Sequence, residues 1–117
     1  MKSDLEILQE AREILETRGW IQRDLYRSDS PNVPGGFCLR GALLKASGWQ
    51  ECTYEDPDGW QDFPEELYEP VDWVCDQLSD KFLGLFSVPY WNDHVAKSKM
   101  DVLELLDKAI AAKKEPK

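Results

Sequence analysis

Apolar residues recur at helical spacing in two long stretches of the chain, one near each end. The first stretch predicts an amphipathic helix over residues 4–18. Ser3 and Glu6 form the S-x-x-E pattern of a capping box, which satisfies unpaired amides at a helix start. Gly19 is expected to stop the helix, because glycine adopts positive φ at little cost. The apolar face consists of Leu5, Leu8, Ala11 and Leu15.

The second stretch predicts the last helix, over about residues 99–113. Ser98 and Asp101 repeat the capping-box spacing, and lysines gather at the carboxyl end, where the helix dipole favours cations. The repeating apolar positions are Val102, Leu103, Leu106, Ala109 and Ile110.

Between these helices the pattern is shorter and more broken. Residues 28–36 are rich in Pro, Gly, Ser and Asn, which is typical of a loop, and a short apolar helix follows from about Phe37 to Gly48. Pro64 opens a further helix that Pro70 either ends or restarts. We therefore expect an all-α fold, a compact bundle of four to five helices with a long irregular acidic loop in the middle, forming one domain over residues 1–117.

Charge is concentrated in the middle of the chain. The formal net charge is −9, and residues 49–80 hold eleven acidic and no basic side chains, whereas residues 1–48 balance and residues 81–117 are slightly basic. Nucleic-acid binding and attachment to anionic membranes both need a basic surface, so this composition argues against each. We therefore expect residues 49–80, which hold the whole excess of negative charge, to be the part of the chain that meets a partner.

Two further features of the sequence indicate the cellular compartment of the protein. No apolar run approaches the ~20 residues that span a bilayer, and the first residues are charged, unlike a signal peptide. The three cysteines, Cys38, Cys52 and Cys75, have spacing that suits neither a disulfide framework nor a metal knuckle. We expect a protein in the reducing cytoplasm, without a cofactor.

Aromatic side chains alternate with carboxylates in the middle segment, which is the composition of a protein-binding surface. We therefore predict a protein partner with a basic surface, met by residues 49–69, and no direct contact with nucleic acid or membrane. Alternatively, the aromatic rings face the core and the acids form an ordinary solvated face. The predicted binding residues are Asp56, Asp58, Trp60, Asp62, Phe63, Glu65, Glu66 and Tyr68.

A cysteine-dependent enzyme is an alternative function. Cys38 lies at or just before a helix start, where partial positive charge lowers a thiol pKa. His94 is the single histidine, and Asn92 and Asp93 beside it could orient an imidazole. The opposing interpretation treats Cys38 as a small buried apolar residue and Asn92 or Asp93 as a cap.

A calcium-binding loop over residues 54–65 is a further alternative. If Tyr54 is position one of a twelve-residue loop, oxygen ligands fall at positions three, five, nine and twelve. However, the first ligand would be Tyr rather than Asp. The candidate ligands are Asp56, Asp58, Asp62 and Glu65.

Several short motifs in order resemble a family of small proteins of unknown function that is common in actinobacteria and their bacteriophages. The motifs are Arg18-Gly19-Trp20, Phe37-Cys38-Leu39-Arg40-Gly41-Ala42-Leu43, Trp91-Asn92-Asp93, and Val102-Leu103 with Ala109. The resemblance covers both ends of the chain and not residues 49–80.

The resemblance implies no established activity. It implies a cytoplasmic setting and the possibility of a phage origin, with a host protein as partner and mimicry of DNA charge as one form of binding. It emphasises Cys38, Gly41, Trp91, Asn92 and Asp93, and His94 does not belong to the pattern. Those positions suit a physical role, in which Gly41 admits a neighbouring helix, Trp91 fills the core and Asn92 or Asp93 bonds backbone amides.

Overall fold

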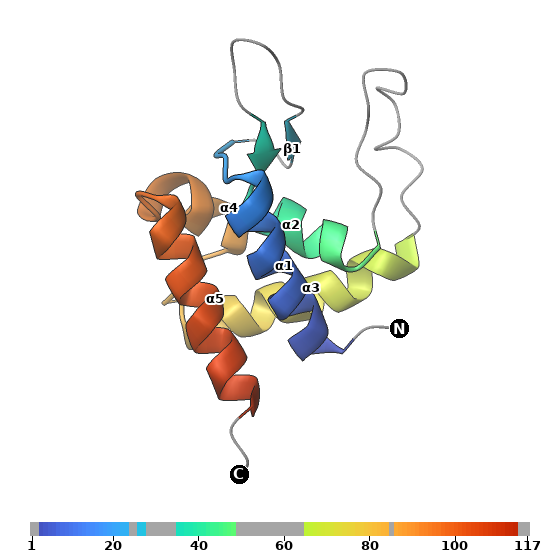
Figure 1. Ribbon diagram of the computed structural model, residues 1–117. Helices are drawn as coiled ribbons and strands as arrows, with labels where there is room; N and C mark the ends of the chain where they lie inside the picture. Colours follow the sequence, from blue (N-terminus) through green and yellow to red (C-terminus); the bar gives the residue numbers. More distant parts are fainter. Residues whose placement is uncertain (1–2, 24–25, 28–34, 49–64, 85, 115–117) are drawn as a thin grey trace.

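The structure is a computed structural model that describes residues 3–23, 26–27, 35–48, 65–84 and 86–114. It is mostly helical, which confirms the all-α prediction, and the described residues contain five α-helices (Figure 1). Residues 49–64, which precede the helix that begins at Glu65 and include most of the predicted acidic loop, lie outside the described part of the chain. The elements are α1 (Asp4–Arg18), β1 (Tyr26–Arg27), β2 (Gly36–Phe37), α2 (Leu39–Ala46), α3 (Glu65–Lys81), α4 (Val88–Tyr90), the π-helical turn η2 (Trp91–Val95) and α5 (Lys99–Lys114).

The two terminal helices begin where their capping residues predict. In α1 the Ser3 hydroxyl accepts from the Glu6 amide at 3.2 Å and the Glu6 carboxylate accepts from the Ser3 amide, which confirms the capping box. In α5 the Ser98 hydroxyl accepts from the Asp101 amide at 3.4 Å. The Asp101 carboxylate accepts instead from the amide of Lys97, so this cap differs from a reciprocal box by one residue.

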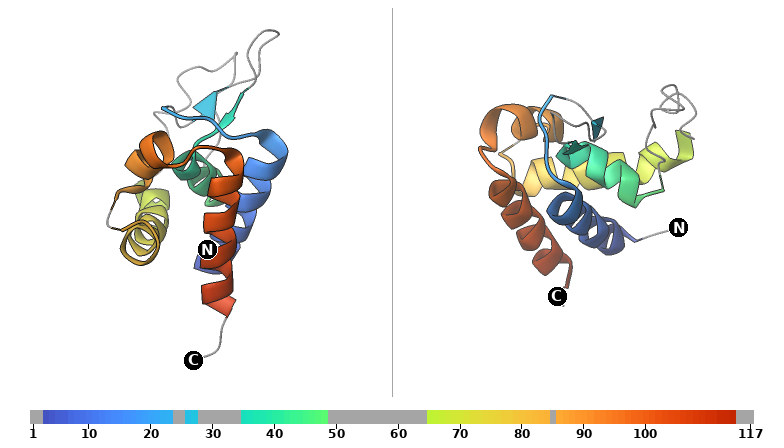
Figure 2. Two further views of the ribbon diagram at one scale, coloured as in Figure 1. Left: turned by 90° about the vertical axis from the view of Figure 1, so that its left-hand side faces the viewer. Right: turned by 45° about the horizontal axis from the view of Figure 1, so that its top comes forward.

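Helices α1 and α5 lie side by side and run antiparallel (Figure 2). The start of α1 meets the end of α5, because Lys113 pairs with Asp4 at 3.3 Å. Halfway along, Arg12 pairs with Asp107. These exposed ion pairs lie at the edge of the contact and contribute little compared with the apolar residues beneath them.

One carboxylate oxygen joins three helices. Asp4 Oδ2 accepts from Trp73 Nε1 at 3.1 Å, from Gln77 Nε2 at 3.3 Å and from Lys113 Nζ at 3.3 Å. Asp4 also opens α1, where the helix dipole favours a negative charge. The side chain therefore fixes the amino end of α1 relative to α3 and α5.

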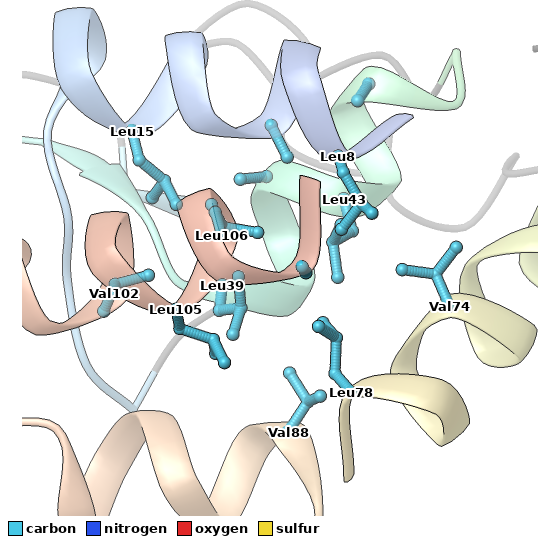
Figure 3. Close-up of a cluster of buried hydrophobic side chains, with 14 of the residues drawn as sticks. Leu8, Leu15, Leu39, Leu43, Val74, Leu78, Val88, Val102, Leu105 and Leu106 are labelled. Atoms are coloured by element: carbon cyan, nitrogen blue, oxygen red, sulfur yellow. The ribbon is translucent and has the colours of Figure 1, made fainter. Parts of the chain in front are cut away.

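The core lies where α1, α2, α3 and α5 converge, with α4 closing one side (Figure 3). The apolar positions three and four apart in each helix point into this common interior, as the sequence pattern predicts. At about 25 cal/mol per Å² of apolar surface, such burial is the main stabilising term of the fold. The central residues are Leu8, Leu15, Leu39, Leu43, Val74, Leu78, Val88, Val102, Leu105 and Leu106.

A short strand pair was absent from the prediction. β1 and β2 pair antiparallel, with Tyr26 opposite Phe37 and Arg27 opposite Gly36. The loop predicted over residues 28–36 therefore extends one residue too far, since Gly36 belongs to β2. The predicted helix start at Phe37 is also wrong, because Cys38 has extended backbone and caps α2, which begins at Leu39.

Helix α3 continues through Pro70, so this proline neither ends nor restarts it. A proline inside a helix removes one backbone hydrogen bond and disfavours helical geometry in the preceding residue. The residues that follow offset this cost, because Val71, Val74 and Leu78 are buried against the core. Tertiary packing therefore overrides the local signal.

We expect Gly36→Ala to destabilise the protein by about 2 kcal/mol. A Cβ at this position would lie 2.8 Å from the carbonyl carbon and oxygen of Gly19, which are backbone atoms and cannot rotate away. Urea unfolding followed by circular dichroism measures the change. Gly84→Asn is the control, because nothing lies within 4 Å of its added Cβ and Asn tolerates its φ of +60°. Equal stability of Gly36→Ala and wild type would contradict the close approach.

Candidate functional site

The motif residues at the two ends of the chain meet at the amino end of α2. The Ser87 hydroxyl caps α4 by accepting from the Tyr90 amide, and η2 follows without a break. The amide of Ala96 donates to the carbonyl of Trp91 at 2.9 Å, which closes a π-type turn. The wider turn holds the Asn92 side chain in the interior, beside Leu39 and Trp20.

Asn92 is fully buried, with 0% of its surface exposed, and all four of its amide hydrogen-bonding positions are used. Its Oδ1 accepts from Trp20 Nε1 at 2.7 Å and from the Leu39 amide at 2.9 Å. Its Nδ2 donates to the Ile21 carbonyl at 3.2 Å and to Asp93 Oδ1 at 3.0 Å. The prediction that this motif bonds exposed backbone amides is confirmed for Asn92, since the Leu39 amide begins α2.

The neighbouring polar residues complete this network. Asp93 Oδ1 also accepts from the Arg23 amide at 2.8 Å, where the backbone has a positive φ of 72°. Gln22 Nε2 lies 3.0 Å from the Asn92 carbonyl and 3.2 Å from that of Ala96, and donates to this end of η2. The chain after α1 therefore both donates hydrogen bonds to η2 and accepts one from it.

Cys38 caps α2 through its sulfur, which accepts from the Gly41 amide at 3.3 Å. The residue is 6% exposed. Burial raises the pKa of the Cys38 thiol to about 11, and the helix amides lower it by less. The expectation that the helix start lowers this pKa is therefore wrong, because desolvation of the thiolate outweighs the stabilisation by the helix amides.

His94 and Cys38 both lie in the described ranges, and no hydrogen bond joins them. Its side chain is exposed, and its ring lies against Tyr90 with centroids 4.6 Å apart. The structure thus brings Cys38, Asn92 and Asp93 around one helix end and does not join His94 to them by any hydrogen bond between the described residues. The arrangement holds backbone segments in place and does not present Cys38 as a nucleophile to solvent.

The other predicted sites fall largely outside the described residues. This applies to Asp56, Asp58, Trp60, Asp62 and Phe63, which carry both the binding and the calcium predictions. Glu65, Glu66 and Tyr68 lie in the first turn of α3, and their side chains are likewise outside the description. Within the described ranges no three His, Cys, Asp or Glu residues group as metal ligands. No helix in those ranges has both the length and the apolarity to cross a membrane.

The RGW, FCLRGAL and WND motifs thus meet at one helix end. The sequence model of a family of unknown function, DUF6197, matches residues 1–112. The chain belongs to the DUF6197 family. The match also spans residues 49–80, which the motifs do not cover. Comparison with curated proteins and with solved structures gave no match.

On the described surface of this DUF6197 chain, α3 carries a row of carboxylates. Glu69, Asp72, Asp76 and Asp80 are all exposed there and recur three or four residues apart. Of these carboxylates, Asp72 pairs with Arg40 at 3.1 Å. The predicted binding residues lie earlier in the chain, at 49–69, although the spacing of the aspartates is visible in the sequence.

Trp20 and Gln22 are partners of the WND motif that were not predicted from the sequence. Trp20 was visible as a motif residue, and its indole N–H needs a partner when it is half-buried. Gln22 carried no comparable signal, because contacts over 70 residues of separation follow only from the packing of η2 on the chain after α1.

Asn92→Asp should destabilise the DUF6197 chain by about 3 kcal/mol or more at pH 7. The substitution replaces two donors by a carboxylate facing the Ile21 carbonyl and the Asp93 carboxylate, so folding raises the pKa of the introduced group. The cost is present above the unfolded pKa of ~3.9 and shrinks as pH falls, when the protonated group can donate. Urea unfolding at pH 7 and 4.5 measures this. Gln9→Glu, the same change at an exposed site, should be nearly neutral at both.

Alkylation at pH 8 should be slower in the folded protein than in urea, by about a hundredfold for Cys38 and about a thousandfold for Cys75. Burial raises their pKa values to about 11 and about 12, so few thiolates are present. Iodoacetamide labelling with peptide mapping resolves each site. If Cys38 reacts as fast in the folded as in the unfolded chain, the thiol is activated and the cysteine-enzyme alternative gains support.

Proposed function

We propose that this DUF6197 chain is a non-catalytic protein-binding module that engages a basic partner surface through the exposed face of α3. This proposal rests on a row of carboxylates that is exposed along one side of α3, whose opposite side is buried in the core. The row consists of Glu69, Asp72, Asp76 and Asp80. Among the described residues only Asp72 of this row has an ion-pair partner. Like charges at this spacing repel one another, and a cationic partner relieves that repulsion.

The composition of α3 supports the same conclusion. Its residues 65–81 include six acidic side chains and one basic, Lys81. Trp73 lies beside the acidic row and is 59% exposed, although its ring nitrogen is anchored on Asp4. An anchored, exposed tryptophan among charges offers apolar contact area with little loss of side-chain entropy on binding. Charge would then steer the encounter and the ring would add affinity.

The predicted binding residues 49–69 run directly into this helix, so the proposal extends the earlier prediction along the chain. The resemblance to actinobacterial and bacteriophage proteins makes a host protein the first partner to test, in a cytoplasmic setting. Mimicry of the charge of DNA is one form that such binding could take, because a partner that binds DNA already carries a basic surface.

The double variant Glu69→Lys, Asp80→Lys should weaken binding of the partner about tenfold at ~50 mM salt, and the difference should shrink as salt screens the charges. Partners recovered from lysate and then purified are measured by isothermal titration calorimetry. Glu13→Lys with Glu104→Lys is the matched control, because both residues are exposed on other helices and the net charge changes equally.

The control double variant should bind within about threefold of wild type. If both double variants weaken binding equally, net charge alone governs the association and α3 is not the binding face. If no partner binds with salt-dependent affinity, the proposed function is wrong.

A further inference from the structure

A cleft of about 320 Å³ opens between the start of α2, α3 and the α4 turn. Figure 2 shows α4 beside α3. This volume lies at the lower end of the range for small-ligand pockets, about 300–1,000 Å³, so the cleft suits one side chain rather than a large cofactor. Its polar lining consists of Arg40, Asp72, Cys75, Asp76, Ser79 and Ser87.

Among the described residues, one carboxylate in the lining of the cleft has no opposite charge paired with it. Arg40 Nη2 lies 3.1 Å from Asp72 Oδ1, and these two charges neutralise each other. Burial raises the pKa of Cys75 to about 12, so its thiol is neutral at physiological pH. Asp76 is exposed and has no ion pair within the described ranges. The cleft therefore carries a net charge of about −1, located at Asp76.

A hydroxyl oxygen adds a second acceptor near this charge. Ser79 follows Asp76 by three residues, so both side chains project from the same face of α3. The Ser79 hydroxyl donates to the Phe86 carbonyl at 2.6 Å, which leaves the lone pairs of its oxygen available to another donor. A ligand with several N–H groups can thus meet a carboxylate and a hydroxyl together.

Two exposed aromatic rings belong to residues on either side of the cleft-lining segment Ser87–Pro89, outside the lining itself. The rings of Phe86 and Tyr90 stack with centroids 5.2 Å apart, and His94 continues the row beyond Tyr90. Both Phe86 and Tyr90 are about half exposed. Ser87 and Pro89, which line the cleft, lie between these two residues in the chain. Flat exposed rings favour a planar cation, through cation–π contact and stacking.

We infer that this cleft receives an arginine side chain of the basic partner. This inference rests on the proposed function and names the group that the partner would insert. A guanidinium presents five donors in a planar fork, which suits the carboxylate of Asp76 together with the oxygen of Ser79. A lysine ammonium offers neither the fork nor the plane. The stem of arginine suits the apolar sides at Val88 and Pro89.

The test uses the full chain and the probe peptide acetyl-Gly-Arg-Gly-amide, followed by chemical shifts of backbone amides. Shifts should concentrate on residues 72–79 and 86–90. The same peptide with citrulline, which keeps the shape of arginine without its charge, should give no saturable shifts. Asp76→Asn should weaken arginine-peptide binding at least about fivefold. Asp80→Asn removes the same charge from α3 outside the cleft and should change binding less than twofold.

The inference is overturned if the citrulline peptide binds equally well, if the two Asn variants weaken binding to the same extent, or if the shifts lie elsewhere. The proposed function fails separately, because Glu69→Lys with Asp80→Lys leaves the cleft lining intact. Weaker partner binding by that double variant, together with no arginine-peptide binding, would leave the proposed function standing and remove the cleft. If instead the double variant binds the partner as wild type does and the arginine peptide binds in the cleft, the proposed function is wrong and the cleft remains an arginine site.

Discussion

One buried amide is the interaction on which the rest of the structure depends. Asn92 has no exposed surface, yet it makes four hydrogen bonds that join the chain after α1, the first turn of α2 and its own π-helical turn. A buried amide without partners would cost several kcal/mol, so each bond also prevents a penalty. Because the partners come from distant parts of the sequence, satisfying them requires one relative placement of those parts.

The helices pack around that constraint. The Leu39 amide that Asn92 accepts from is at the start of α2, whose apolar side chains fill the centre of the core. Helix α1 packs against α2 and against the antiparallel α5, and α3 packs against α2 (Figure 1). The contacts of Trp20, Cys38 and Asn92 are therefore architectural, since these residues hold backbone segments and the start of α2 in place.

The proposed binding face lies on α3, away from Asn92, because a binding face needs polar groups that are exposed to a partner. Asn92 is fully buried and all its hydrogen-bonding positions are used within the chain, so its side chain offers no donor or acceptor to a partner. The outward side of α3 has the opposite properties, with exposed carboxylates, an exposed tryptophan and a polar cleft next to an aromatic stack. A module that binds by charge and aromatic contact can vary this face without disturbing the core, because the buried positions of α3 are Val71, Val74 and Leu78.

The sequence by itself determined the elements whose signals are local. Apolar spacing and the Ser3 cap located α1 at residues 4–18, and the same signals located the last helix within one residue of its end. The excess of acidic residues in the middle was equally visible, since charge is a matter of counting. The tertiary structure alone decided the β1–β2 pairing, the continuation of α3 through Pro70, the pKa of Cys38 and the partners of Asn92. Each of these depends on burial or on groups far away along the chain, and neither can be read from neighbouring residues.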